Sequence, residues 1–217
     1  MRAPLIVRDP YQTARGVRSQ AIVSWVDMAP TILDFAGVFD RQTRKASPEV
    51  VRAARQSARG RQGLTKDYAA PGTFHGRSFL ATLGEKLPTG WDEAYGSHTF
   101  HEITMYYPMR VVRERRFKLI WNLAAPLPFP FASDLLAAST WQQQLQLGPQ
   151  ADYGNRTVDA YVHRPPFELY DLENDPFEAR NLADMQEHAS TLKRLQTKLR
   201  DFQRSTNDPW ISKWSYE

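Results

Sequence analysis

The sequence of 217 residues predicts an α+β fold, in which a small antiparallel sheet has one face covered by a C-terminal amphipathic helix. β-rich runs at residues 111–112 and 117–121 flank four charged residues, which is typical of a hairpin. A third run, at 167–172, alternates apolar and polar side chains. Over residues 185–202 the apolar positions recur at steps of three and four, which gives one apolar stripe along a helix.

The sequence also suggests how this helix begins and which face it exposes. Asp184 with Glu187 three residues later resembles a capping box, so we expect the helix to start there. Basic side chains fall off the apolar stripe, and we interpret them as its solvated face. They are Lys193, Arg194, Lys198, Arg200 and Arg204.

Near the N-terminus we expect a short buried strand at Pro4–Val7 and then a helix over residues 27–37. Asp27 can cap the first turn of that helix. Pro30 is tolerated there because its missing N–H has no partner in the first turn. Gly37 supplies the left-handed stop.

Two regions look less regular. Residues 38–73 are rich in Arg, Ala, Gln and Gly, and we interpret them as a surface insert with one helix over residues 48–58. Residues 124–166 carry six of the fifteen prolines and predict a long ordered loop with one helix around residues 135–147.

The amino-acid composition limits which kinds of site this chain can contain. Hydrophobic residues make up 41% of the chain, which is enough for a core. The absence of cysteine excludes disulfides, thiolate metal sites and a cysteine nucleophile. The net charge of +4 is compatible with a polyanionic partner. The Arg-rich stretch 41–61 has no interleaved aromatic ring, which favours a solvated insert over a nucleic-acid site. No membrane span or signal peptide is recognised, so the compartment stays unassigned.

Three segments, taken together, resemble the sulfatase family. Residues 23–37 (VSWVDMAPTILDFAG) look like a helix late in the sulfatase catalytic domain, and residues 75–80 (HGRSFL) look like the segment that follows it. Residues 168–183 (ELYDLENDPFEARNLA) match a signature before the last sulfatase helix. Three further stretches resemble the heparan N-sulfatase group in particular. They are 101–110 (HEITMYYPMR), 126–130 (PLPFP) and 207–210 (NDPW).

The resemblance implies an alkaline-phosphatase-like α/β catalytic domain, mostly absent here, followed by a C-terminal sheet domain. We therefore expect residues 1–37 to be a remnant of the catalytic domain, 38–73 the surface insert and 74–217 the C-terminal domain. A fragment, a split gene and a gene model that starts too late all remain open.

The family's chemistry needs a formylglycine, made from the first residue of a Cys/Ser-x-Pro-x-Arg motif, and a calcium ion held by Asp and Asn oxygens. The nearest match here, residues 106–110 (YYPMR), has Tyr at the nucleophile position, and a phenol cannot form the aldehyde. We therefore expect no catalytic residue, no metal ligand and no activity from this chain alone. A periplasmic, secreted or lysosomal location is expected for the complete family enzyme.

The resemblance suggests substrate contacts in a loop over residues 101–110. His101 and Glu102 would bind the hydroxyls of an amino sugar, Tyr107 would stack on it, and Arg110 would contact a carboxylate or sulfate. In the alternative interpretation, the first two form a hydrogen-bonded pair, Tyr107 packs inside and Arg110 pairs with an acid. The other histidines show no ligand spacing and are expected to be structural or exposed; they are His75, His98, His163 and His188.

The function expected from the resemblance is hydrolysis of sulfate from sulfated glycans, with N-sulfoglucosamine of heparan-type chains as substrate. An O-sulfatase of the same family is an alternative, and so is a non-catalytic module that binds sulfated glycan or protein. The expected partners are the glycan and either an upstream catalytic half or a second copy of the chain, with no nucleic acid and no membrane.

Overall fold

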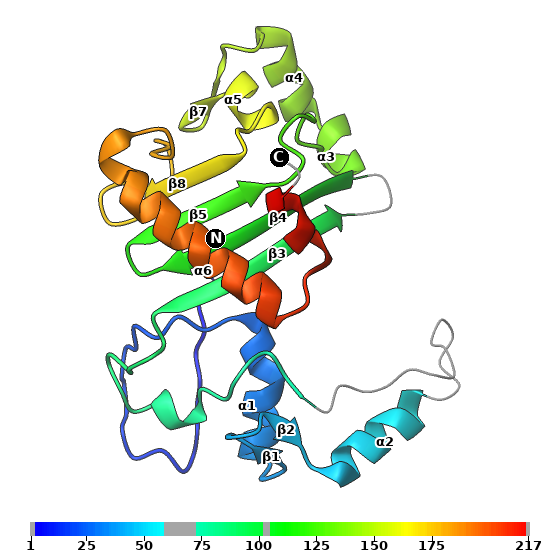
Figure 1. Cartoon of the computed structure of the whole chain (residues 1–217), viewed down its shortest axis with the longest axis vertical. Coiled ribbons are helices and arrows are strands. Elements are labelled where there is room, and N and C mark those ends of the chain that lie inside the picture. Colours follow the sequence, from blue (N-terminus) through cyan, green and yellow to red (C-terminus); the bar gives the residue numbers. More distant parts are fainter. Residues whose placement is uncertain (1–2, 59–72, 102–104, 216–217) are drawn as a thin grey trace. The chain divides into compact units, whose positions relative to one another are not determined.

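The computed structural model describes residues 3–58, 73–101 and 105–215, which form two compact units, Met1–Asp92 and Glu93–Glu217 (Figure 1). We describe each unit by itself. In the described ranges, no helix combines the length and the hydropathy needed to cross a membrane.

The C-terminal unit is built on a four-stranded antiparallel sheet in the order β3-β4-β5-β8. Its strands are β3 (Glu93–His101), β4 (Met105–Glu114), β5 (Phe117–Asn122) and β8 (Phe167–Asp171). The hairpin predicted around residues 113–116 is confirmed, with Val112 opposite Leu119. Strand β3 has no counterpart in the sequence analysis, and its register shifts between His98 and Phe100.

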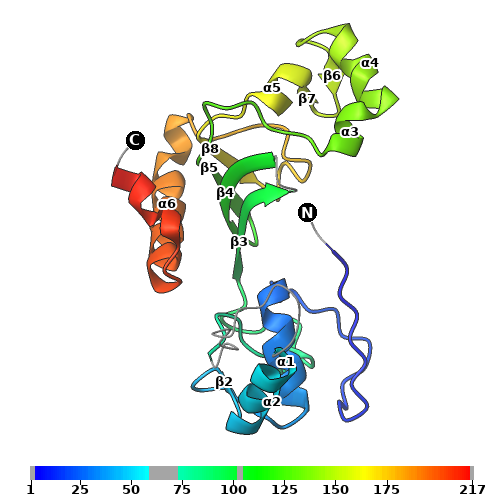
Figure 2. The same cartoon turned by 90° about the vertical axis from the view of Figure 1, so that its right-hand side faces the viewer.

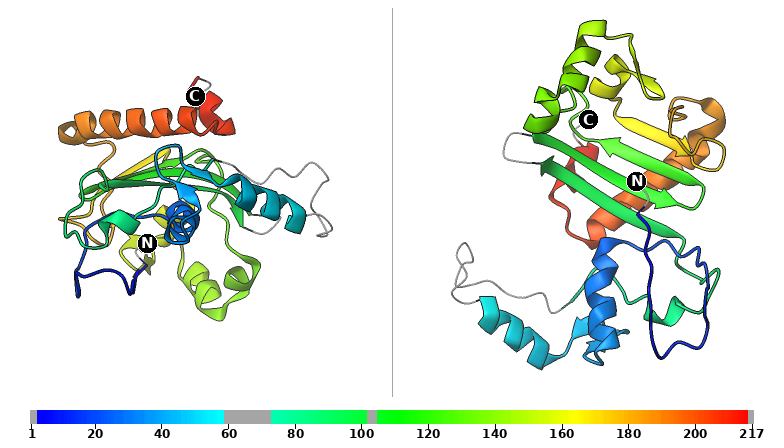
Figure 3. Two further views of the ribbon diagram at one scale, coloured as in Figure 1. Left: turned by 90° about the horizontal axis from the view of Figure 1, so that it is seen from below. Right: turned by 180° about the vertical axis from the view of Figure 1, so that it is seen from behind.

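Helix α6 (Ala189–Ser205) covers one face of this sheet, as predicted (Figures 2 and 3). Leu195 and Leu199 are completely buried in one core cluster with Val112 and Leu169. Burying a side chain of this kind contributes about 1.5–3 kcal/mol to stability. The contact between α6 and the sheet is therefore the main apolar contribution to the stability of this unit. The fold class is therefore α+β.

Two details of α6 differ from the prediction. The helix begins at Ala189, after a 3-10 turn over Gln186–His188, and no side-chain capping bond forms at that turn. The basic residues are also more than a solvated face. Arg194 and Lys198 both bond the Glu114 carboxylate, at 2.7 Å in each case. The bond from Arg194, followed by those from Lys198, lowers the pKa of Glu114 despite burial.

Between β5 and β8 the chain forms a small group of short elements rather than a loop with one helix. The predicted helix at 135–147 is two helices, α3 (Ser133–Ala137) and α4 (Ser139–Leu147), because Ala138 between them has an extended backbone. The remaining elements of this group are β6 (Asp152–Tyr153), β7 (Arg156–Thr157) and α5 (Val158–Val162).

The N-terminal unit contains α1 (Met28–Phe35), the two-residue strands β1 (Phe39–Asp40) and β2 (Lys45–Ala46), and α2 (Pro48–Ala58). Helix α2 has the predicted bounds, and Gly37 has the predicted positive φ of 72°. The strand expected at Pro4–Val7 is wrong: the segment forms no strand, and Ile6 is 93% exposed.

Hydrogen bonds join the two sulfatase-like segments of this unit. The Asp27 carboxylate accepts bonds from the backbone N–H of Ser24 (2.8 Å) and of Arg77 (2.9 Å), and Ser78 donates to Asp34. Gly76 passes so close that an added Cβ would lie 2.0 Å from the backbone oxygen of Val26. These motif residues therefore hold segments 23–37 and 75–80 together.

Residues 74–92 cluster with the N-terminal unit, whereas the sequence analysis groups them with the C-terminal domain. The domain boundaries at 37/38 and 73/74 stay predictions.

Candidate functional site: the β3–β4 hairpin and the Glu168 network

Three of the four predicted substrate-binding residues, His101, Tyr107 and Arg110, lie on the paired strands β3 and β4. Strand β3 ends at His101, which pairs with Met105, the first residue of β4. The expectation of a loop is therefore wrong for residues 105–110, which belong to β4. Glu102 and the side chain of His101 lie outside the described residues.

Tyr107 is completely buried on the sheet face opposite to α6. Its ring packs edge-on against Phe129, with centroids 5.1 Å apart. The hydroxyl has no hydrogen-bond partner in the part of the chain that the structure describes, and burial raises its pKa. The backbone oxygen of Tyr107 lies 3.1 Å from Nδ1 of His98. Tyr107 thus packs inside, and its ring is not open to stack on a sugar.

Arg110 faces the α6 side of the sheet, where it forms a two-bond ion pair with Asp208. Its Nε and Nη2 donate to the two carboxylate oxygens at 2.5 and 2.9 Å, and its guanidinium lies 4.9 Å from the ring of Trp210. Burial acts to raise the pKa of Asp208, but the bonds from Arg110 and from the Trp210 N–H outweigh it and lower the pKa. Segments 101–110 and 207–210 therefore meet through this buried pair.

Two exposed rings of the hairpin were not identified from the sequence. Phe100 and Tyr106 are cross-strand neighbours, 63% and 48% exposed, and Trp210 Nε1 lies 3.4 Å from the Tyr106 hydroxyl. Alternation along a strand puts Tyr106 and Tyr107 on opposite faces. The alternation of a strand could have identified these exposed rings. Interpreting residues 101–110 as a loop leaves that alternation unused.

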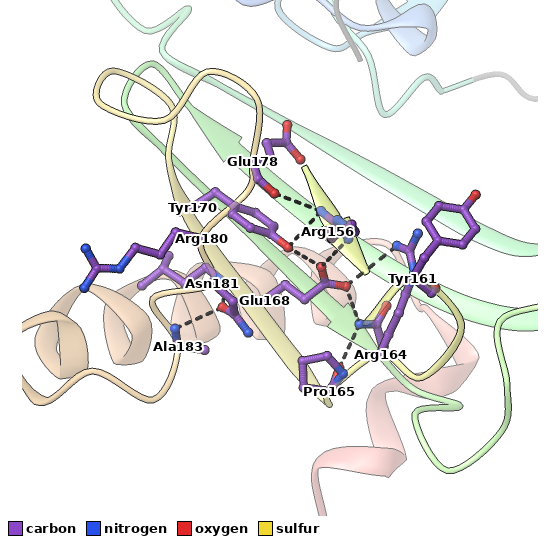
Figure 4. A network of polar contacts seen from close by, with 12 residues as sticks. Arg156, Tyr161, Arg164, Pro165, Glu168, Tyr170, Glu178, Arg180, Asn181 and Ala183 are labelled. Atoms are coloured by element: carbon purple, nitrogen blue, oxygen red, sulfur yellow. Dashed lines mark hydrogen bonds and ion pairs between the residues drawn. The ribbon is translucent and has the colours of Figure 1, made fainter. Parts of the chain in front are cut away.

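A second polar centre lies around Glu168, on the sheet face opposite to α6 (Figure 4). This carboxylate is buried and accepts hydrogen bonds from Asn122 Nδ2 (2.7 Å) and the Tyr170 hydroxyl. Arg156 and Arg164 approach it at 3.6 and 3.7 Å. Two cations and two donors thus compensate one buried negative charge, as burial of a carboxylate requires.

The other residues of the 168–183 signature bind their own chain. Asn181 Oδ1 accepts the backbone N–H of Leu169 at 2.8 Å and that of Ala183 at 3.0 Å (Figure 4). Arg116 holds the pKa of the Asp171 carboxyl down at about 2. The signature therefore fixes how β8 turns toward α6, which is a structural role.

The chain does not supply the donor set that the sulfatase cofactors need. Over residues 3–58, 73–101 and 105–215, no three His, Cys, Asp or Glu side chains come together as a metal site. The sequence has neither cysteine nor a Ser-x-Pro-x-Arg motif from which a formylglycine could form. The two acids of the α1 segment, Asp27 and Asp34, bond within their own unit. We derive no catalytic step from this chain.

Comparison with known proteins finds a similarity to sulfatases. No family model matches. The chain is 34% identical over 215 residues to human N-sulphoglucosamine sulphohydrolase, covering 96% of the chain and 38% of that protein. It is 26% identical over 198 residues to an ulvan-active sulfatase of Formosa agariphila, covering 90% of the chain and 31% of that protein.

A solved structure of a protein in complex with its substrate, D-glucosamine-2-N,6-O-disulfate, shares the fold at a TM-score of 0.50 and 22% identity. That likeness covers 89% of this chain and 27% of the other. The chain spans less than two fifths of the length of the curated relatives described above. The chain is therefore similar to sulfatases over nearly its whole length, and a C-terminal portion of a sulfatase fits these matches.

Proposed function

We propose that this chain is the C-terminal portion of a sulfatase that removes sulfate from N-sulfoglucosamine in heparan-type glycans, and that it is inactive without a catalytic portion. The observation that carries the proposal is the 34% identity to human N-sulphoglucosamine sulphohydrolase across 96% of the chain. Two observations support the inactivity of the chain alone: the sequence has no nucleophile motif, and the described residues form no cluster of metal ligands.

The contribution of this portion is substrate recognition by the β3–β4 hairpin. His101 and Glu102 contact the hydroxyls or the nitrogen of the sugar. Glu102 faces away from the sulfate, because an uncompensated carboxylate would repel it. Tyr107 and Arg110 hold the hairpin in place, the first by packing and the second through Asp208.

The first test is a turnover assay of the purified chain with calcium, using N-sulfoglucosamine and an aryl sulfate. We expect no sulfate release from either substrate. Turnover that scales with the concentration of the chain would refute the proposed inactivity. If the gene extended upstream encodes no Cys/Ser-x-Pro-x-Arg motif, and the chain still binds sulfated heparin oligosaccharides, the chain is instead a non-catalytic binding module.

The second test addresses the hairpin in the chain joined to its catalytic portion. Glu102→Gln and His101→Ala should each lower kcat/KM for N-sulfoglucosamine by about 1–3 kcal/mol in transition-state terms, the scale of a lost buried hydrogen bond. An aryl sulfate, which makes no sugar contacts, should be affected much less. Equal losses on both substrates would show that the two residues serve folding instead of recognition.

A further inference from the structure

The C-terminal unit contains a cavity of about 520 Å³ that neither the predicted hairpin residues nor Glu168 lines. It borders the Glu168 network at Tyr161, whose backbone oxygen accepts a bond from Arg164. It lies among α3, α4, β6 and α5. Its volume falls within the range of about 300–1,000 Å³ that is typical of small-molecule sites. Ten residues line it: Phe131, Leu135, Ala138, Ser139, Thr140, Trp141, Gln143, Gln144, Tyr153 and Tyr161.

Four aromatic rings form one wall of this cavity and hold each other in place. Trp141 is buried, and its ring packs on Phe131 (centroids 4.1 Å apart) and on Tyr153 (5.1 Å). Tyr153 in turn packs edge-on against Tyr161 at 4.8 Å. Such a wall offers apolar surface at low conformational-entropy cost, because packing already fixes its rings.

The polar part of the lining consists of hydroxyl and amide groups from α4, and none of the ten lining residues is charged. Two further polar atoms of lining residues, the indole Nε1 of Trp141 and Oε1 of Gln144, are buried without a hydrogen-bond partner among the described residues. An unmade bond of a buried group costs about 1–3 kcal/mol, so a ligand hydroxyl that completed either bond would be favoured.

We propose that this cavity binds an uncharged pyranose ring, as a carbohydrate site distinct from the proposed substrate contact. The C–H face of a sugar suits the aromatic wall, and its hydroxyls suit the Gln, Ser and Thr side chains. A sulfated or carboxylated ring is disfavoured, because none of the ten described lining residues carries a positive charge. A hydrocarbon is disfavoured too, because it would bury these polar groups without replacing their hydrogen bonds.

The test is a titration of the purified chain with N,N′-diacetylchitobiose, an uncharged disaccharide of N-acetylated amino sugars, followed by NMR of the Trp141 indole N–H. Trp141→Phe identifies that signal. We expect a saturable shift with a Kd on the order of 1 mM. Gln144→Ala should weaken binding by about five-fold or more, the scale of one lost hydrogen bond. Gln146→Ala, an exposed position of the same helix outside the lining, should leave the affinity unchanged.

Absence of a saturable shift up to about 50 mM N,N′-diacetylchitobiose would overturn the proposal. Equal weakening by Gln144→Ala and Gln146→Ala would overturn it as well, and so would equal binding of cyclohexane-type probes without hydroxyls. Unchanged melting temperatures of both variants show that they fold. The readout needs no sulfatase activity, so its failure and the failure of the proposed function are distinguishable.

Discussion

The two units of this chain both expose large apolar side chains, but they differ in whether their described residues form a buried apolar cluster. In the C-terminal unit, one cluster runs from Val112 and Leu119 of the sheet to Leu195 and Leu199 of α6, all completely buried. The N-terminal unit buries Phe79 and Trp91 but leaves Trp25 82% exposed. Its other exposed large apolar side chains are Leu5, Ile6, Val7, Tyr11, Val26, Ile32, Phe35 and Leu87.

This difference shows that two units with similar sequence motifs need not be equally stable on their own. Both units carry sulfatase-like motifs, and in both the motif residues bond to their own unit. Among the described residues, only those of the C-terminal unit add a buried apolar cluster between a sheet and a helix to those bonds. We infer that the N-terminal unit depends for its stability on further protein surface, in keeping with the expectation that residues 1–37 belong to a larger domain.

The largest expected effect follows from separating the units. Residues 93–217 alone should unfold cooperatively, because their core is intact. Residues 1–92 alone should show no cooperative transition and should bind a hydrophobic dye. Circular dichroism melts and dye fluorescence of the two pieces measure this. A sharp melt of the 1–92 piece without dye binding would break the comparison.

The next largest effect concerns the buried pair of Arg110 and Asp208. Asp208→Asn removes one partner and leaves Arg110 buried without its counter-charge, which should lower the free energy of unfolding by about 3–5 kcal/mol. The double variant Arg110→Met/Asp208→Leu should recover much of that loss, since no charge is then buried. Urea unfolding measures both. A loss for the double variant equal to or larger than that for Asp208→Asn would contradict this account.

In the N-terminal unit, Gly76→Ala should destabilise the fold more than the addition of a methyl group at any other described glycine. The new Cβ would meet the Val26 backbone oxygen at 2.0 Å, so the backbone must shift and the Asp27–Arg77 bond is lost. We expect a loss of about 1–3 kcal/mol, the usual cost of forcing atoms into a packed site. Gly84→Ala, whose nearest neighbours are side-chain atoms at 3.6 Å, is the matched control. Equal melting shifts would show that the close approach does not matter.

The smallest effect is a pH dependence at Asp171. Its pKa of about 2 lies below the value near 3.8 expected when unfolded, because Arg116 bonds the charged form. The stability that this pair contributes is therefore present above pH ~4 and is lost as the pH falls toward 2. Arg116 is half exposed, so we expect at most about 1 kcal/mol. In Asp171→Asn, the free energy of unfolding should fall less steeply as the pH is lowered from about 4 to about 2. An unchanged pH dependence would show that the pair does not cause it.

Much of this fold could be predicted from local patterns. The apolar stripe of α6, the 113–116 hairpin, the bounds of α2 and the stop at Gly37 each depend on a short stretch of sequence, and each is confirmed. The exposed Pro4–Val7 segment could not be predicted, because its composition is that of a buried strand, whereas no described part of the chain covers it.

The candidate site was less predictable, because long-range partners decide it. Nothing near Arg110 in the sequence identifies Asp208, 98 residues away, as its counter-charge. Strand β3 was missed because its residues include Gly96, Ser97 and two histidines, which are poor strand signals. If β3 is not recognised, residues 101–110 are interpreted as a loop. The strand alternation that separates the buried Tyr107 from the exposed Tyr106 is then lost.

The most direct test of the comparison is hydrogen exchange of the whole chain, followed residue by residue. The account predicts that amides of β4, β5, β8 and α6 exchange only through global unfolding of their unit. Amides of α1 should exchange at least about a hundred-fold faster, through openings that leave the sheet folded. Equal protection of α1 and the sheet, lost together in one denaturant transition, would contradict the claim that only the C-terminal unit is self-sufficient.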